Sequence, residues 1–277
     1  MSHAKPFFIV SSGRSGTAML HKALSAVSGV EMHHEYMVQI VQPLAVKHYL
    51  GLADRKITAR LIAETYGAAV RYSRGTHWGD SSNKLSWLIP ELAAAFPDAR
   101  FVHLVRDGRK VASSYFHKLA DECYDDRSTA ILQAYYDAPK LHAVPPPEKK
   151  YWWPLPRHGT GDAEIFRNFN QFQRIAWHWA EVNRVALAEL AQIPAERTMF
   201  VRLEELRAAP SEVRALYDFL GFSWHDQAHG VFVRPHNVNR PEDRLLDPVQ
   251  RAQFDAIAGD MLARLGYAER PEYAVNY

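Results

Sequence analysis

The residues SSGRSGTAML at positions 11–20 have the types and the spacing that suit an anion-binding turn. They follow a short apolar run at 7–10 and precede apolar residues at helical spacing, which predicts a strand, a tight loop and a helix. Gly13 and Gly16 permit a tight turn and close backbone approach. The N–H groups and the dipole at the helix N-terminus attract anions. The charged and hydroxyl-bearing residues of the loop are Arg14, Ser15 and Thr17.

The loop lacks the lysine that a nucleoside triphosphatase needs. The pattern G-x-x-x-x-G-K-[ST] places a lysine after the last glycine, whereas Thr17 and Ala18 follow Gly16 here. No apolar strand that ends in an aspartate offers a persuasive magnesium partner. Taken alone, the loop is equally consistent with an ordinary strand-to-helix turn with serine and threonine caps.

A second candidate anion site lies in VRDGRKVASSYFHK at residues 105–118. Arg106 stands at the end of a predicted strand, and Ser114 follows eight residues later in the predicted helix. Two neighbouring anion sites would suit a ligand that carries phosphate at two ends. From the residues alone, an arginine at a strand end more often pairs with a nearby carboxylate such as Asp107.

The two loops together resemble those of the sulfotransferases that use 3′-phosphoadenosine-5′-phosphosulfate (PAPS). The pattern is closest to the tyrosylprotein, or Golgi-type, branch and its bacterial relatives, in which an "NK" also precedes the helix that leads to the "VRDGR" strand. The resemblance is good over 6–120 and fair over roughly 165–222. It implies that the first loop binds the 5′-phosphosulfate and the second binds the 3′-phosphate. The implied cofactor-binding residues are Gly13, Arg14, Ser15, Gly16, Thr17, Ala18, Arg106 and Ser114.

The resemblance also has departures. Many members of the family carry a tyrosine near the adenine where this chain has Leu203, so no adenine contact is carried over. Arg234 and Arg240, near the C-terminus, could supply a further phosphate contact, but the match there is too loose to assign either one.

Sulfuryl transfer to a hydroxyl needs a base, positive charge at the leaving oxygen and an in-line acceptor. The resemblance implies Glu35 as the base, because the Golgi-type branch has a glutamate about twenty residues past the loop arginine. His34 is the alternative, and both residues could instead solvate a helix end. Arg14 and Lys84 match the family positions beside the leaving oxygen. No familiar ligand spacing supports a metal site in EMHHEYM, and we expect no metal.

The elements that must position these residues alternate between strand and helix. Strands are predicted at 7–10, 101–105 and 198–203, and the last precedes a helix that begins at Pro210 and ends at Gly221. This alternation predicts an α/β fold with a central parallel sheet flanked by helices, P-loop-like by resemblance, in a single domain over 1–277. In the helical stretch RIAWHWAEVNRVALAEL, Trp177 is expected to pack in the core, and His178 is left unassigned.

Residues from about 121 to 162 interrupt the alternation. This stretch is rich in proline, aromatic and charged residues, and it has no clear period. A long irregular insertion is usually a functional loop or a mobile linker. Tyr151, Trp152 and Trp153 argue against simple disorder, because such rings need something to cover. Two interpretations stay open: a surface loop pinned by its aromatic rings, or a lid or substrate wall.

The composition excludes some partners. Lys and Arg number 33 against 31 Asp and Glu, which argues against a general nucleic-acid binder. The only cysteine, Cys123, allows no internal disulfide and fits a reducing cytoplasm, which is the location we expect. No secretory signal and no apolar stretch of the ~18 residues that a membrane span needs are visible, so we expect no membrane partner.

We therefore expect a sulfotransferase that moves the sulfuryl group of PAPS to a hydroxyl on a small molecule or a peptide. The products would be 3′-phosphoadenosine-5′-phosphate (PAP) and a sulfate ester. Two alternatives remain: a P-loop kinase or NTPase-like protein that lacks its lysine, and a non-catalytic PAP-binding protein.

Overall fold

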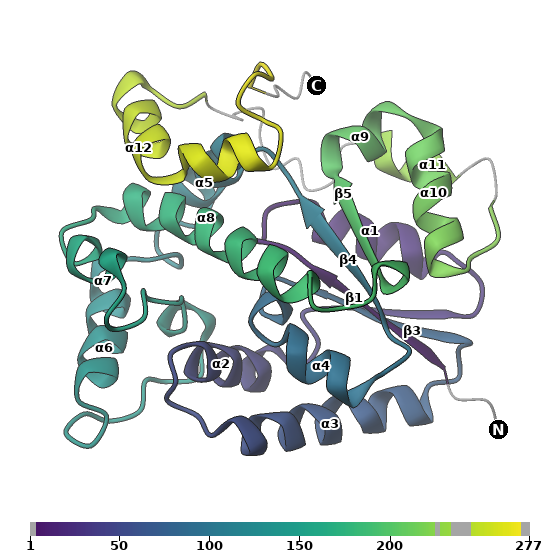
Figure 1. The fold of residues 1–277 in the computed structure, drawn as a ribbon, viewed down its shortest axis with the longest axis horizontal. Coiled ribbons are helices and arrows are strands. Elements are labelled where there is room, and N and C mark those ends of the chain that lie inside the picture. Colours follow the sequence, from purple (N-terminus) through teal and green to yellow (C-terminus); the bar gives the residue numbers. More distant parts are fainter. Residues whose placement is uncertain (1–3, 225–227, 234–244, 273–277) are drawn as a thin grey trace.

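The computed structural model describes residues 4–224, 228–233 and 245–272. Within them, five parallel strands form one sheet in the order β2-β3-β1-β4-β5 (Figure 1). The strands are β1 (Lys5–Val10), β2 (Val30–His34), β3 (His77–Ser82), β4 (Arg100–Val105) and β5 (Thr198–Arg202). The expected α/β fold with a central parallel sheet flanked by helices is confirmed.

The position of β1 in the sheet determines where a ligand can bind. The chain leaves β1 to build β2 and β3 on one side and then crosses to build β4 and β5 on the other. Loops that leave the carboxyl ends of neighbouring strands in opposite directions open a crevice at such a switch point. The predicted loops at 11–16 and 106–108 follow β1 and β4, so both lie at this edge of the sheet.

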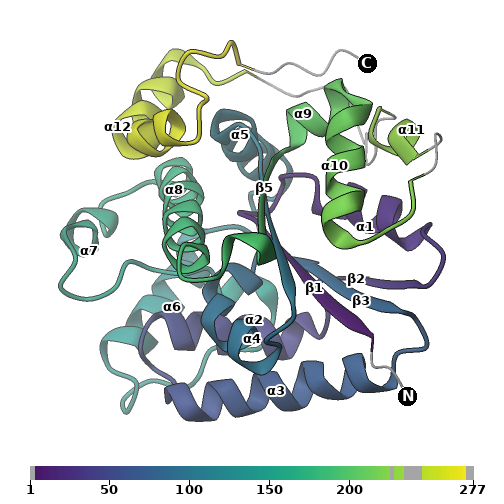
Figure 2. The same cartoon turned by 45° about the vertical axis from the view of Figure 1, so that its right-hand side comes forward.

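Alternate residues of β1 pack into two separate hydrophobic cores, one on each face of the sheet. Phe8 and Val10 belong to one buried cluster, whereas Phe7 and Ile9 belong to the other. Figure 2 shows the two helical layers on either side of the sheet. The layer over Phe7 and Ile9 contains α1 (Thr17–Ser25), α9 (Leu203–Ala208), α10 (Pro210–Leu220) and α11 (Ala228–Val233).

The opposite layer is larger and is centred on the long helix α8 (Gln171–Leu190). A capping box starts this helix, because the Asn170 side chain accepts from the Gln173 N–H and the Gln173 side chain accepts from the Asn170 N–H. None of the helices in the described ranges has the length and apolar character needed to cross a membrane. The other main helices of this layer are α2 (Val38–Tyr49), α3 (Arg55–Tyr72), α4 (Ile89–Ala95), α5 (Gly108–Lys118) and α12 (Pro248–Arg264).

Strands β2 and β3 were not expected from the sequence, because their residues VEMHH and HWGDSS are largely polar. In β3, Asp80 is completely buried and accepts hydrogen bonds from the Tyr36 N–H and the Tyr66 hydroxyl. Burial raises the pKa of Asp80 to about 6. A polar strand can occupy the interior when its side chains find such partners.

The segment 121–162 is more regular than its composition suggests. Helix α6 (Asp126–Asp137) begins after Asp125, whose carboxylate accepts a hydrogen bond from the Ser128 N–H at 2.9 Å. Two short helices follow, η2 (Lys149–Tyr151) and α7 (Gly161–Phe166). The expectation of an irregular stretch was therefore wrong for α6, where this aspartate cap starts a helix that the composition of the segment obscures.

The residues 146–153, which we call the strap, are anchored through two buried indole rings. Trp152 is 1% exposed and Trp153 is 3% exposed. The indole N–H of Trp152 donates to the Pro146 carbonyl at 2.7 Å, and that of Trp153 donates to the Glu122 carbonyl at 2.6 Å. The aromatic residues of the segment therefore serve as core, and they fix the backbone beside the carboxyl edge of the sheet.

Candidate active site

The loop after β1 is shaped by its backbone. Gly13, Arg14 and Gly16 all have positive φ angles, of 78°, 53° and 95°. The Gly13 N–H donates to the Ser11 hydroxyl at 3.0 Å, and the Ser15 hydroxyl donates to the Gly13 carbonyl at 3.0 Å. No side chain caps the N-terminus of α1, which begins directly after Gly16. The first N–H groups of α1 therefore have no capping side chain as acceptor and can donate to a bound anion.

Helix α5 holds this loop in place through Tyr115. The Tyr115 hydroxyl donates to the Ser12 carbonyl at 3.0 Å, and it lies 2.0 Å from the position that a Cβ atom on Gly13 would take. Position 13 must therefore be glycine for two reasons, the positive φ angle and the contact with the tyrosine.

The two predicted loops meet at Arg14. Its Nε donates to the Ser114 hydroxyl at 3.0 Å, and its carbonyl accepts a hydrogen bond from Nη1 of Arg106 at 3.1 Å. Arg106 and Ser114, which the family resemblance paired through their spacing, therefore both contact Arg14. Asp107 was considered as a structural partner for Arg106. Its carboxylate instead forms an ion pair with Arg109, with 2.6 Å between Nη2 and Oδ2.

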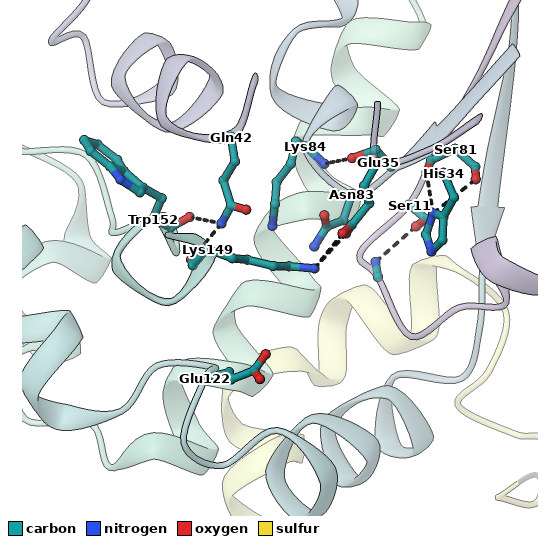
Figure 3. A network of polar contacts seen from close by, with 12 residues as sticks. Ser11, His34, Glu35, Gln42, Ser81, Asn83, Lys84, Glu122, Lys149 and Trp152 are labelled. Atoms are coloured by element: carbon teal, nitrogen blue, oxygen red, sulfur yellow. Dashed lines mark hydrogen bonds and ion pairs between the residues drawn. The ribbon is translucent and has the colours of Figure 1, made fainter. Parts of the chain in front are cut away.

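Glu35 lies directly after β2, in a left-handed backbone conformation with φ 56°. Figure 3 shows its carboxylate beside the ammonium of Lys149, which lies 2.7 Å from Oε1 and 2.9 Å from Oε2. Burial alone would raise the pKa of Glu35. The positive charges of Lys149 and Lys84, with the hydrogen bond from Lys149, outweigh burial and hold that pKa below its ordinary value.

Lys84 follows β3 and is 1% exposed. Its Nζ lies 4.3 Å from the ring centroid of Trp153, a cation–π distance. Burial first and the charge of Lys149 second lower the pKa of Lys84 well below its usual value, and the Glu35 carboxylate acts in the opposite direction. The predicted lysine is therefore in the interior of the molecule and not at the surface of a helix start.

His34, the alternative base, adjoins Glu35 but has a different environment. Its Nδ1 donates to the Ser81 carbonyl at 2.8 Å, and its ring is exposed. The ring of His21 lies 6.0 Å away, centroid to centroid. In the described part of the chain, no group of three or more His, Cys, Asp or Glu residues could hold a metal ion.

Three residues of this region were not foreseen, namely Lys149, Tyr115 and the unassigned His178, and Trp153 was expected only as an aromatic residue of the 121–162 segment. His178 is completely surrounded by protein, with its Nε2 3.3 Å from the Ser12 carbonyl. Burial, followed by the charge of Lys84, lowers the pKa of His178 to about 3. Tyr115 could have been suspected because it follows Ser114 in the same motif. No local pattern marks Lys149 or Trp153 as neighbours of Glu35 and Lys84.

Three other expectations can be located. Trp177 is buried and packs edge-on against the ring of Phe166, with 5.0 Å between centroids, so its core role is confirmed. The Leu203 side chain contacts the loop at Gly16, where a Cβ atom would lie 2.7 Å from its Cδ1. Arg234 and Arg240 lie outside the described residues.

Comparisons with known proteins cover the same region. Residues 6–143 match the Sulfotransferase family, a stretch that contains both loops, Glu35 and Lys84. No curated protein gives a significant match.

Many solved structures are similar in fold, and they include bacterial sulfotransferases. A sulfotransferase from Alicyclobacillus acidocaldarius is 18% identical, with a TM-score of 0.53 over 97% of each chain. The sulfotransferase domain from the curacin biosynthetic pathway is 15% identical, with a TM-score of 0.50 over 95% of this chain and 98% of that domain. At these identities the likeness concerns the fold.

Proposed function

We propose, from the match of residues 6–143 to the Sulfotransferase family, that this chain is a member of that family and moves a sulfuryl group from PAPS to a hydroxyl acceptor. The products are PAP and a sulfate ester. The acceptor is a hydroxyl of a small molecule or a peptide. We keep the Golgi-type branch and a cytoplasmic location as parts of this proposal, the first on the position of Glu35 and the second on the lone buried Cys123.

The convergence of two cationic loops on Arg14 is the observation that carries the proposal. The first loop offers a helix N-terminus without a side-chain cap, two glycines at positive φ, and the guanidinium of Arg14. The second loop brings Arg106 and Ser114 against the first. Donors of this kind fit a nucleotide with phosphate at both the 5′ and the 3′ positions.

The residues present also suit the transfer itself. When PAPS is bound, it supplies the sulfuryl group and a phosphate leaving group. Glu35 accepts the proton of the acceptor hydroxyl while the new S–O bond forms and the S–O bond to the phosphate breaks. The electron pair of the broken bond remains on the phosphate oxygen. Lys84 and Arg14 stabilise the negative charge that develops there, as fixed cations do in phosphoryl transfer.

A thermal-shift comparison of ligands tests this proposal. PAP should raise the melting temperature far more than ATP with magnesium does, because a ligand at a hundred times its Kd adds about 2.7 kcal/mol of stability. Equal shifts would favour the P-loop NTPase alternative. Turnover of labelled PAPS with a panel of hydroxyl acceptors then separates an enzyme from a protein that only binds PAP.

The variant Arg106→Ala makes the comparison specific to the 3′-phosphate. Loss of a charged hydrogen bond costs about 1.5–3 kcal/mol, so PAP should bind much more weakly. Adenosine 5′-phosphosulfate lacks the 3′-phosphate and serves as the control ligand, whose affinity should change little. Equal losses for the two ligands would show that Arg106 supports the loop and does not bind phosphate.

A further inference from the structure

The strap is attached to the same helix that follows Glu35. The Gln42 side chain on α2 is completely buried, and its Nε2 donates to the Lys149 carbonyl at 2.9 Å and to the Trp152 carbonyl at 2.8 Å. At the beginning of α2, the Val38 N–H donates to the Glu35 carbonyl at 3.2 Å. One helix therefore fixes both the backbone that carries Lys149 and the backbone that carries Glu35.

The backbone of Glu35 is also held from the other side. Its N–H donates to the Ser81 carbonyl at 3.1 Å, which extends the pairing of β2 with β3 by one residue. Its positive φ angle then turns the side chain out of the strand direction. The carboxylate meets the Lys149 ammonium through both oxygens, and both side chains remain partly accessible, at 23% for Glu35 and 34% for Lys149.

The groups that face the Glu35 carboxylate come from four elements. Lys149 on η2 and Lys84 after β3 are the two cations, and Lys149 is the one in direct contact. His34 on β2 adds a weaker influence, and the Tyr115 hydroxyl on α5 interacts electrostatically with the carboxylate. If Lys149 lost its charge, Lys84 would be the one lysine left among these groups to act on the mostly buried Glu35 carboxylate.

We propose that Lys149 is a positioning residue of the active site, whose ammonium holds the Glu35 carboxylate through both oxygens and orients it towards the acceptor, so that the strap forms one wall of the site. The inference rests on the proposed function for the role of Glu35 as base. Trp153 completes the same wall, because its ring covers the ammonium of Lys84.

The distinguishing consequence concerns pH. Glu35 must be ionised to accept a proton, so activity falls when the pH drops through its pKa. Lys149 lowers that pKa. Removing the charge should therefore raise the pKa of Glu35 and move the acid limb of the kcat/KM profile to higher pH. A residue that only stabilised the fold would lower activity equally at every pH.

The test compares Lys149→Met and Lys149→Gln with Lys150→Met. Lys150 is the next residue of η2, and its ammonium lies 5.1 Å from the Tyr151 ring centroid, so it provides a matched loss of charge. Both Lys149 variants should shift the acid limb to higher pH, the Lys150 variant should leave it unchanged, and Lys149→Arg should restore it. An unshifted limb in folded Lys149→Gln, which keeps a donor but no charge, overturns the proposal.

A measurement that needs no turnover separates this inference from the proposed function. The side-chain carboxyl of Glu35 can be titrated by carbon NMR in the wild type and in the variants, with Glu35→Gln to assign the signal. A midpoint that rises in both Lys149 variants supports the proposal even if no acceptor is ever sulfated. A midpoint that does not move refutes it even if the enzyme turns over PAPS.

Discussion

The pKa values of Lys84 and Glu35 are set by different balances of burial and charge. Lys84 is buried against the ring of Trp153 and lies near Lys149. Burial and the charge of Lys149 both favour the neutral form of Lys84. Glu35 is less deeply buried and faces two cations, which favour its ionised form. An anionic nucleotide on the neighbouring loop would favour the charged form of Lys84. Binding of PAPS, as proposed, would therefore be coupled to the protonation of Lys84.

The role of Glu35 gives the first residue-scale prediction. Glu35→Gln keeps the shape of the side chain and removes the proton acceptor, and general-base catalysis contributes roughly 10²–10⁴-fold. We expect kcat to fall by about that factor while PAP affinity stays near that of the wild type. Steady-state kinetics with the least acidic acceptor that reacts, together with PAP titrations, measure both quantities.

His34→Ala is the comparison for that experiment, because His34 adjoins Glu35 in the sequence. Its Nδ1 is occupied by the Ser81 carbonyl, and its ring is exposed. We therefore expect a much smaller loss of kcat. If His34→Ala abolished turnover in a folded protein while Glu35→Gln did not, the base would be His34.

The sequence located the side chains that lie within motifs, and missed those that arrive from elsewhere. Arg14, Arg106 and Ser114 could be placed together because their two motifs resemble those of the PAPS-dependent sulfotransferases, and all three residues meet in the structure. Lys149 reaches Glu35 across 114 residues from a segment without periodicity. Such a contact depends on how the strap is anchored to α2, which no local pattern reports.

At the scale of elements, apolar runs were enough to predict β1, β4 and β5 but not the other two strands. The polar residues of β3 are buried because Asp80, Ser81 and Ser82 find partners inside the protein, and alternation of apolar and polar residues is lost. The strand that leads to Lys84 was therefore the hardest to recognise.

The loop between β1 and α1 is also an element, and its glycine gives a prediction with an internal control. Gly13 and Gly51 have almost the same φ angles, 78° and 74°. A Cβ atom at Gly13 would meet the Tyr115 hydroxyl at 2.0 Å, whereas a Cβ atom at Gly51 would meet nothing within 4 Å. Both alanine variants carry the backbone cost of a positive φ, about 1–2 kcal/mol, and only Gly13→Ala adds a collision.

We therefore expect Gly13→Ala to lose more stability than Gly51→Ala, by about 1–3 kcal/mol if overpacking sets the difference. It should also lose the thermal shift with PAP, which Gly51→Ala should retain. Urea unfolding and thermal shifts of the two variants measure these effects. Equal behaviour of the pair would mean that the loop can move away from Tyr115 without consequence.

At the scale of the whole molecule, α8 links the site to the rest of the core. His178 on this helix contacts the loop after β1, and Glu181 accepts a hydrogen bond from the Tyr49 hydroxyl on α2. Asn183, two residues after Glu181, accepts a hydrogen bond from His103 of β4 at 2.9 Å. Of these partners of α8, His103 is the one whose protonation can change at mildly acidic pH.

His103 therefore provides the prediction at this scale. The Asn183 oxygen can only accept, so Nε2 of His103 carries the hydrogen, while Nδ1 is buried with no hydrogen-bond partner within the described residues. Burial lowers the pKa of His103 to about 4, from 6.5 in an exposed histidine, although the bond to Asn183 acts in the opposite direction. Between pH 6.5 and about pH 4, His103 is protonated in the unfolded chain but neutral in the folded protein. The free energy of unfolding therefore falls as the pH falls through that window.

Between pH 7 and pH 5, His103 should therefore cost about 2 kcal/mol of stability, at about 1.4 kcal/mol for each pH unit below 6.5. His103→Gln keeps a donor for Asn183 and cannot titrate, so its unfolding free energy should fall less over the same interval. Asp80, whose raised pKa of about 6 acts in the opposite sense, and His178, which acts in the same sense as His103, remain in both proteins. The difference between the two urea unfolding series consequently isolates His103, and identical pH dependence would show that its imidazole finds a proton acceptor in the folded state.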